Sequence, residues 1–396
     1  MAAPGTRFIT RFGLTFPPST STGRPSKETA PVSSPRRCLK LACAKRWCRI
    51  GTDDTGRTEI ECNGKGVLFV EAKAEELTID KFGDFAPSPE CRRMLIPTVD
   101  PGEGDDAIPL LLLQVTYLKC GRVCLGVGAH HLVSDGVASL LFINAWSDIT
   151  RGIEPAVPPF LDQSLVLPRS PPSVRFPHVE FKRYAAGIHT YADIPAISTA
   201  ILELTADQIA ALKRSCAATM PSPRRVTTYE VVAAHRDQGL HHDRRPSLPE
   251  GYIGNVIFPT VAIAAVGDVV SERPGDVASR IHRATAIADD EYLRSALDFL
   301  EMEEDVRSLG RWAGNFTSAD LSITCWTSLP IYEADFGWGR PEFMGPASMF
   351  YGGLCYIMPK PPGKDWGIMV AVSMEAEYMD YYKELFYDFS SDQCNV

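Results

Sequence analysis

At 396 residues the chain is long enough for two lobes, and its 45% hydrophobic and 22% charged residues are typical of a soluble globular protein. The formal net charge of -9 argues against a nucleic-acid partner, because such binding needs clustered Lys and Arg to meet phosphates. The 11 cysteines show neither CxxC pairs nor regular spacing, so we expect reduced thiols and no metal site. The longest apolar run, 108–118, is too short to cross a membrane. These features predict a cytoplasmic protein that has no membrane partner.

Residues 1–50 differ in character from the rest. They hold ten Lys and Arg against one acidic residue, Glu28, and they are rich in Ser, Thr and Pro without a sustained period of two or 3.6. This composition favours disorder, and its Arg-rich, acid-poor character also fits an organelle transit peptide. An altered gene start is a third interpretation.

From residue 51 the pattern is typical of a folded domain. Residues 57–74 predict two strands around an Asn63-Gly64 turn, the usual sign of a β-hairpin. Two apolar runs within 109–131 predict neighbouring strands. A helix is then expected over 136–152, where Gly152 is a stop signal and one face carries Val137, Leu140, Leu141 and Trp146.

The proline-rich stretch 154–198 predicts a crossover between lobes. After it, 198–217 predicts a strand and a helix, with Thr205 as N-cap and Gln208 at the capping-box position. Strand-like runs follow at 321–332, 349–359 and 366–379, and a closing helix at 381–389. We therefore assign 1–50 as an atypical segment, 51–167 as an N-terminal lobe, 168–198 as the crossover and 199–396 as a C-terminal lobe.

One histidine stands where chemistry is expected. His131 ends a predicted buried strand, and Asp135 follows four residues later, just before Gly136 and a helix. A neutral imidazole at such a strand end can accept a proton from an alcohol as the alcohol attacks a carbonyl. The same spacing recurs at His189 and Asp193 without a preceding strand, so the pattern alone leaves open that His131 is merely a satisfied polar residue.

A second motif is the pentapeptide "DFGWG" at 335–339, between strand-like segments. Its first three residues are also found in protein kinases, but no Gly-rich phosphate loop or HRD loop accompanies them. Two glycines around Trp338 predict a tight loop. No GxSxG elbow or catalytic cysteine setting is present, which favours direct transfer between two bound substrates.

The segments "HHLVSDG" and "DFGWG" together resemble the plant BAHD acyltransferase family. "LPEGYIGNVIF" and "LPIYEADFGWGRPEFMG" resemble more closely its hydroxycinnamoyl-CoA:shikimate/quinate hydroxycinnamoyltransferases, over about residue 49 to the C-terminus. This resemblance implies an α/β, two-lobed, chloramphenicol-acetyltransferase-like fold with a central channel between the lobes. It implies a monomer with no permanently bound cofactor, for which hydroxycinnamoyl-CoA is the acyl-donor substrate and a hydroxylated acid such as shikimate or quinate is the acceptor.

The resemblance also implies the roles of individual residues. His131 would be the general base and Asp135 would support its loop. Thr324 and Trp326 would hold the oxyanion and the substrate ring, and Arg311 would grip the acceptor carboxylate, as a guanidinium does in two-pronged fashion. The remaining motif residues would be architectural: Asp335, Phe336, Gly337, Trp338 and Gly339.

Two departures from the family motivate an alternative. The start of a normal N-terminal lobe is replaced before Arg49, and near His235 the chain lacks a segment in which relatives carry an arginine that pairs with the aspartate at 335. The alternative is a catalytically impaired remnant that binds aromatic acyl-CoA or lacks activity. A third interpretation, a peptide-synthetase condensation domain, shares the double-histidine motif but does not account for "DFGWG".

Overall fold

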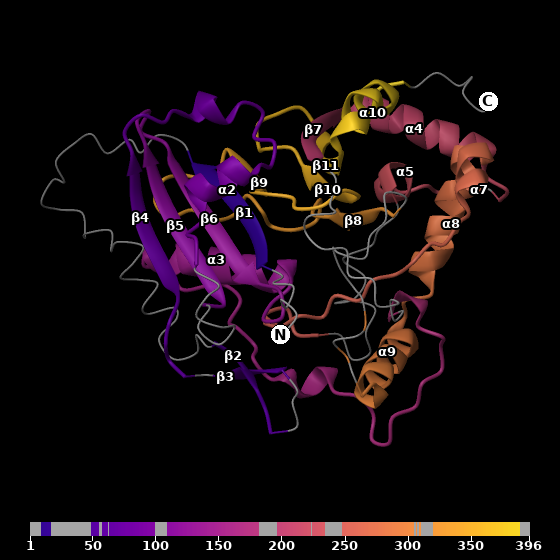
Figure 1. The fold of residues 1–396 in the computed structure, drawn as a ribbon, viewed down its shortest axis with the longest axis horizontal. Coiled ribbons are helices and arrows are strands. Elements are labelled where there is room, and N and C mark those ends of the chain that lie inside the picture. The colour runs from indigo at the N-terminus through magenta and orange to yellow at the C-terminus, as the bar shows by residue number, and fades with distance from the viewer. Residues whose placement is uncertain are drawn as a thin grey trace, which may run out of the picture.

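The computed structural model describes residues 9–16, 49–54, 58–61, 63–99, 109–181, 196–222, 224–233, 248–304, 306, 309 and 320–388. Two β-sheets dominate it, with helices packed around them (Figure 1). The five-stranded first sheet has the order β4 (Leu68–Ala74), β5 (Leu111–Leu118), β6 (Val123–His130), β1 (Ile9–Phe16) and β9 (Phe343–Pro346). The four-stranded second sheet has the order β7 (Ile197–Thr205), β11 (Gly367–Glu375), β10 (Leu354–Pro359) and β8 (Ser322–Cys325). The α/β, two-lobed prediction is confirmed.

The helices lie between and after these strands. The described α-helices are α2 (Pro89–Leu95), α3 (Gly136–Thr150), α4 (Ala206–Thr219), α5 (Thr228–Ala233), α7 (Val266–Ser271), α8 (Pro274–Ala286), α9 (Asp290–Met302) and α10 (Met379–Phe386). Short 3-10 helices are η1 (Ile79–Phe82), η4 (Gln163–Val166), η5 (Val179–Phe181) and η9 (Ala376–Tyr378). Within the described ranges, no helix has the length and apolar character needed to cross a membrane.

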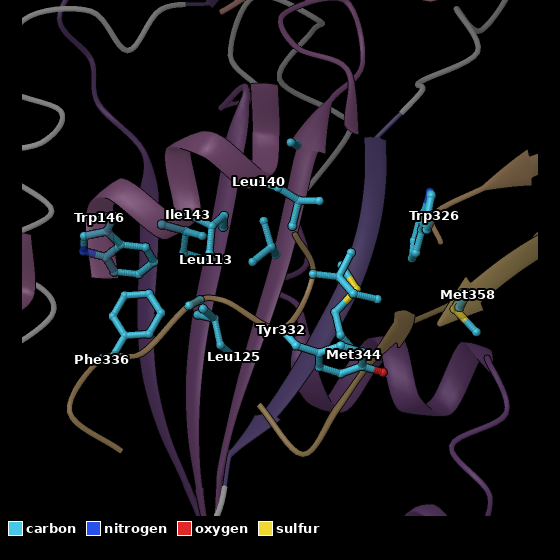
Figure 2. Close-up of a cluster of buried hydrophobic side chains, with 14 of the residues drawn as sticks. Leu113, Leu125, Leu140, Ile143, Trp146, Trp326, Tyr332, Phe336, Met344 and Met358 are labelled. Carbon is cyan, nitrogen blue, oxygen red and sulfur yellow. The ribbon is translucent and has the colours of Figure 1, made fainter. Parts of the chain in front are cut away.

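The first sheet is buried on both faces because its two central apolar runs alternate their side chains. Leu113 and Leu125 point toward α3 and pack with Trp146 (Figure 2). Leu112 and Cys124, one residue away along each strand, pack instead with Leu95 of α2. A side chain cannot fit at Gly126, because a Cβ there would lie 1.8 Å from the Leu95 carbonyl oxygen.

One hydrophobic cluster joins the two lobes. It contains Trp146 of α3, Met344 of β9, and Trp326 and Met358 from the second lobe, and it places them in a single buried group (Figure 2). Since burying one such side chain contributes about 1.5–3 kcal/mol, this shared core holds the lobes in a fixed relation.

Several predicted elements are confirmed. The strands over 109–131 pair as antiparallel β5 and β6, and α3 follows at Gly136, with Gly152 just beyond it at a φ of 76°. Thr205 and Gln208 form the expected capping box of α4. The predicted face of α3 is only partly right. Leu140 and Trp146 are buried, whereas Val137 and Leu141 are half-buried, because the small Ala138 and Ser139 take the closest approach to the core.

The prediction of disorder over 1–50 is wrong for residues 9–16. These form β1, which pairs antiparallel with β6 on one side and β9 on the other, so that Gly13 stands opposite both Gly126 and Gly345. Two strands remote in sequence supply these hydrogen-bond partners, and a local pattern of eight residues cannot reveal them. The other residues of 1–48 lie outside the described residues. Because β9 comes from the C-terminal half, a boundary at 199 also does not separate the two sheets.

The predicted hairpin over 57–74 is wrong in its pairing. Both strands exist, and Gly64 sits in a turn with a φ of 72°. However, β3 (Thr58–Glu61) pairs with β2 (Arg49–Thr52), whereas β4 pairs in parallel with β5. Packing of β4 against the core, where Phe69 meets Trp146 edge-on at 6.2 Å, outweighs the local turn signal.

Candidate active site

The motif turn, His131–Asp135, connects the end of β6 to the start of α3. Strand β6 ends at His130, whose backbone N–H donates to the Leu110 carbonyl at 2.8 Å. The chain then turns at once, since the N–H of Val133 donates to the His130 carbonyl at 3.0 Å. His130 is buried, whereas His131 is half-buried. Of the two histidines, His131 is therefore the more accessible.

Asp135 fixes this turn through both carboxylate oxygens. Its Oδ1 accepts a 2.9 Å hydrogen bond from the N–H of Ala138 and so caps the N-terminus of α3. Its Oδ2 accepts a 3.1 Å bond from the N–H of Val256, and its own N–H donates to the Gly254 carbonyl at 3.0 Å. The side chain is 2% exposed. This geometry agrees with a supporting rather than a reacting carboxylate.

The surroundings of His131 favour its neutral form. Burial lowers the pKa of its imidazole below the ordinary value, and this effect outweighs a hydrogen bond to the residue's own backbone and the charge of Asp135, which both raise the pKa. A neutral imidazole has one unprotonated ring nitrogen, which can accept a proton. His131 is therefore able to act as a base at neutral pH.

Thr324 and Trp326 lie at the end of β8 and just beyond it. They share one face of this edge strand, because side chains alternate with a period of two. Trp326 is 6% exposed and packs on the ring of Tyr356, with ring centroids 5.0 Å apart. Thr324 is half-buried and stands opposite Tyr356 in the parallel pairing of β8 with β10.

The loop after Trp326 reaches α3, the helix that follows the motif turn. A Cβ placed on Gly136 would lie 3.3 Å from a methyl carbon of Leu329. Asn144, two turns further along α3, donates through Nδ2 to the Pro330 carbonyl at 3.3 Å. The segment that carries Trp326 is thus tied to the helix that carries the Asp135 cap.

The DFGWG loop is architectural in its contacts. Asp335 Oδ1 accepts from the N–H groups of Gly337 at 2.8 Å and Gly339 at 3.0 Å, and both glycines have a φ near 90° that other residues rarely adopt. Phe336 packs edge-on against Trp146, with centroids 4.6 Å apart. The loop therefore closes on its own aspartate and inserts one ring into the core.

Arg151, which sequence reasoning did not single out, is the described cation beside Asp335. Its Nη1 lies 3.4 Å from Asp335 Oδ2, and its Nη2 lies 3.0 Å from Asp148. Arg311, the predicted acceptor residue, lies outside the described residues. In the described part of the chain, no three His, Cys, Asp or Glu side chains gather as metal ligands would.

A buried cluster around His178 was not predicted from the sequence. His178 Nδ1 lies 2.8 Å from Glu180 Oε1, and its Nε2 lies 2.8 Å from the hydroxyl of Ser295 on α9. The order Ser–His–Glu is that of a hydrolytic triad, but Ser295 is fully buried and its oxygen accepts the N–H groups of Arg175 at 2.8 Å and Phe176 at 3.3 Å. With its lone pairs occupied and no access, Ser295 is not a nucleophile, and the cluster anchors the crossover to α9.

Comparisons with known proteins identify a family for the chain. The model of the Transferase family matches residues 48–236 and 241–389. The chain is 44% identical to shikimate O-hydroxycinnamoyltransferase of Nicotiana tabacum, over 87% of this chain and 84% of that protein. It is 41% identical to hydroxycinnamoyl-CoA:5-hydroxyanthranilate N-hydroxycinnamoyltransferase HHT4 of Avena sativa, over 86% of this chain and 82% of that protein.

Among solved structures, the fold is similar to F. graminearum TRI101 complexed with coenzyme A and deoxynivalenol. The TM-score is 0.71 at 20% sequence identity, and the match covers 96% of this chain and 95% of that one. At this identity the similarity shows the fold alone. It supports the two-lobed fold.

Proposed function

The chain belongs to the Transferase family, the family of the BAHD acyltransferases that it resembles in sequence, and on that premise we propose that it transfers a hydroxycinnamoyl group from coenzyme A to the hydroxyl of shikimate, quinate or a related acceptor. The observation that carries the proposal is the motif turn, in which Asp135 fixes the backbone beside a half-buried His131, whose pKa is lowered by burial, at the end of β6. Its curated relatives are named for this transfer.

In the proposed reaction His131 accepts the proton of the acceptor hydroxyl as its oxygen attacks the thioester carbonyl. The carbonyl oxygen becomes an oxyanion in the tetrahedral intermediate. When the intermediate collapses, the C–S bond breaks, the ester forms, and the coenzyme A thiolate takes the proton from the imidazolium of His131. The base is thereby restored, and neither a covalent acyl-enzyme nor a resident cofactor is needed.

Thr324 and Trp326 are proposed to line the reacting centre from the second lobe. Donors aimed at a developing oxyanion are worth about 3 kcal/mol each, so a hydroxyl such as that of Thr324 would contribute at the transition state. The contact of Leu329 with Gly136 supports this placement, because it brings the chain just after Trp326 to the first turn of α3. Arg311 remains a proposed partner of an acceptor carboxylate.

The acceptor is the open part of the proposal. One relative is named for shikimate and transfers to oxygen, and another is named for 5-hydroxyanthranilate and transfers to nitrogen. The test is release of free coenzyme A thiol from p-coumaroyl-CoA with shikimate, quinate and 5-hydroxyanthranilate in parallel. We expect release that depends on shikimate or on quinate. An intact, folded protein that releases thiol with neither shikimate nor quinate contradicts the proposal.

A second candidate is a remnant that binds aromatic acyl-CoA without turnover. The observation behind it is that the family match begins only at residue 48, so the preceding segment departs from the family pattern. Titration calorimetry with p-coumaroyl-CoA, beside the thiol assay, separates the two candidates. Binding without thiol release would favour the remnant.

We further propose that the protein acts as a monomer in the cytoplasm. Size-exclusion chromatography with light scattering tests the first statement, and fractionation of cells that express the tagged full-length chain tests the second. A dimer mass, or recovery with organelles, contradicts them.

A further inference from the structure

The segment Gly251–Val256 is the direct support of the motif turn. Asp135 contacts it twice, through its own N–H to the Gly254 carbonyl at 3.0 Å and through Oδ2 to the Val256 N–H at 3.1 Å. Both contacts are backbone groups of this segment, so its path determines where the turn lies. Any displacement of Gly254 or Val256 moves Asp135, and with it His131.

Residues 158–163, in the proline-rich stretch, hold this segment in turn. Phe160 and Tyr252 form an isolated parallel bridge in which the N–H of Phe160 donates to the Gly251 carbonyl at 2.8 Å. The N–H of Ile253 donates back to the Phe160 carbonyl at 2.9 Å. The backbones approach closely here, since a Cβ on Gly251 would lie only 2.0 Å from the Pro158 carbonyl oxygen.

One side-chain pair completes the attachment. Gln163, the first residue of η4, donates through Nε2 to the Ile253 carbonyl at 2.8 Å, and its Oε1 accepts from the Tyr252 hydroxyl at 2.7 Å. Tyr252 is 1% exposed, so its ring is fixed in the interior. This pair lies directly on Gly254, where a Cβ would stand 2.6 Å from Tyr252 Cε1 and 2.9 Å from Gln163 Oε1.

We propose that Gln163 and Tyr252 are positioning residues for the base His131. Their hydrogen bond fixes the path of Ile253 and Gly254, Gly254 and Val256 fix Asp135, and Asp135 fixes the turn that carries the imidazole. Neither residue needs to touch a substrate. The proposal rests on the proposed function, because its consequence is a change in turnover.

The expected effect is on rate rather than on binding. Gln163 is exposed, so we expect the loss of its side-chain hydrogen bonds to cost little stability. A shift of a reacting group by 1 Å can cost about a hundredfold in rate, so a fraction of that shift predicts roughly a three- to tenfold loss of kcat. The KM values for the acyl-CoA and the acceptor should stay within about twofold, because no binding contact is removed.

The test uses three variants of the full chain with p-coumaroyl-CoA and the acceptor that the wild type uses. Gln163→Met keeps the length of the side chain and removes its hydrogen bonds to Ile253 and Tyr252, together with a longer one of 3.5 Å to the Leu161 carbonyl. Tyr252→Phe keeps the buried ring and removes only the hydroxyl. Gln208→Met is the control, because the half-buried Gln208 also makes a side-chain hydrogen bond with the backbone, in which its Oε1 accepts from the Thr205 N–H at 2.8 Å in the capping box of α4.

We expect Gln163→Met and Tyr252→Phe to lose kcat at constant KM, and Gln208→Met to keep the wild-type kcat even where it melts earlier. The proposal is overturned if both folded variants keep the wild-type kcat, or if Gln208→Met loses as much. If Gln163→Met does not fold, Tyr252→Phe decides by the same criterion. If the wild type turns over and the variants are unaffected, only the positioning proposal is overturned. If the wild type itself shows no turnover, the proposed function is overturned together with the positioning proposal.

Discussion

Replacing Asp135 tests how the motif turn is held, because each oxygen of this carboxylate has one partner. Oδ1 caps α3 by accepting from Ala138, and Oδ2 accepts from Val256, while the side chain is 2% exposed. Loss of an N-cap costs about 1 kcal/mol. A buried N–H left without a partner costs about 1–3 kcal/mol more. We therefore expect Asp135→Ala to lower the free energy of unfolding by about 2–4 kcal/mol.

Asp135→Asn separates the two contributions. The amide oxygen of Asn can still accept from Ala138, and Asn is as good an N-cap as Asp. Its NH₂ group, however, faces the Val256 N–H, and two donors cannot bond to each other. The expected loss is about 1–3 kcal/mol, smaller than for Ala.

The assay is urea unfolding of both variants, extrapolated linearly to water. Asp289→Ala is the control, because Asp289 caps α9 through a 2.9 Å bond from the N–H of Tyr292 but is exposed, and it should cost only about 1 kcal/mol. A loss below about 0.5 kcal/mol for Asp135→Ala, within the range of ordinary surface substitutions, would refute this account of the turn. No loss for Asp135→Asn would refute the separate role of the Val256 contact, and equal losses for Asn and Ala would refute the contribution of the Ala138 cap.

Three further predictions address the base, the packing and the crossover. Because His131 must be neutral to accept a proton and burial lowers its pKa, kcat/KM should fall with decreasing pH only below the ordinary histidine value of about 6.5, and a midpoint above that value would contradict this. Gly254→Ala should destabilise the protein by about 1–3 kcal/mol, because the added Cβ would lie only 2.6 Å from Tyr252 Cε1. Gly267→Ala in α7, where nothing lies within 4 Å of an added Cβ, should instead be neutral or stabilising by up to about 1 kcal/mol. Equal effects of the two substitutions in thermal melts would contradict the close packing of Tyr252 against Gly254. Ser295→Ala should lower the melting temperature by leaving two backbone N–H groups and His178 without their shared partner, while the folded fraction keeps its kcat; a loss of kcat in folded protein would show that the cluster acts on the site.

The elements that the sequence predicted well are those with a strong local signal. Strands β5 and β6 are long apolar runs. Helix α3 begins after the N-cap Asp135, and helix α4 begins with the capping box of Thr205 and Gln208. The position of His131 at a strand end followed from the same local pattern. These features need no information from distant parts of the chain.

The features that were missed depend on distant partners. Strand β1 is a strand because β6 and β9 stand on either side of it, and the Asn63-Gly64 turn does not make a hairpin because β4 pairs with β5. The Ser295–His178 bond joins residues 117 positions apart, and Arg151 meets Asp335 across 184 positions. No spacing rule along a single sequence predicts such pairs.

The measurement that tests the central claim most directly is thiol release from p-coumaroyl-CoA by the wild type, His131→Ala and His189→Ala, each with the accepted acid. His189 has an aspartate at the same spacing, Asp193, but no strand before it in the sequence pattern, so it is the matched control. Removal of a general base typically costs about 10²–10⁴-fold in rate. We predict a loss of that size for His131→Ala and wild-type release for His189→Ala. Wild-type release by a folded His131→Ala would contradict the assignment of the base.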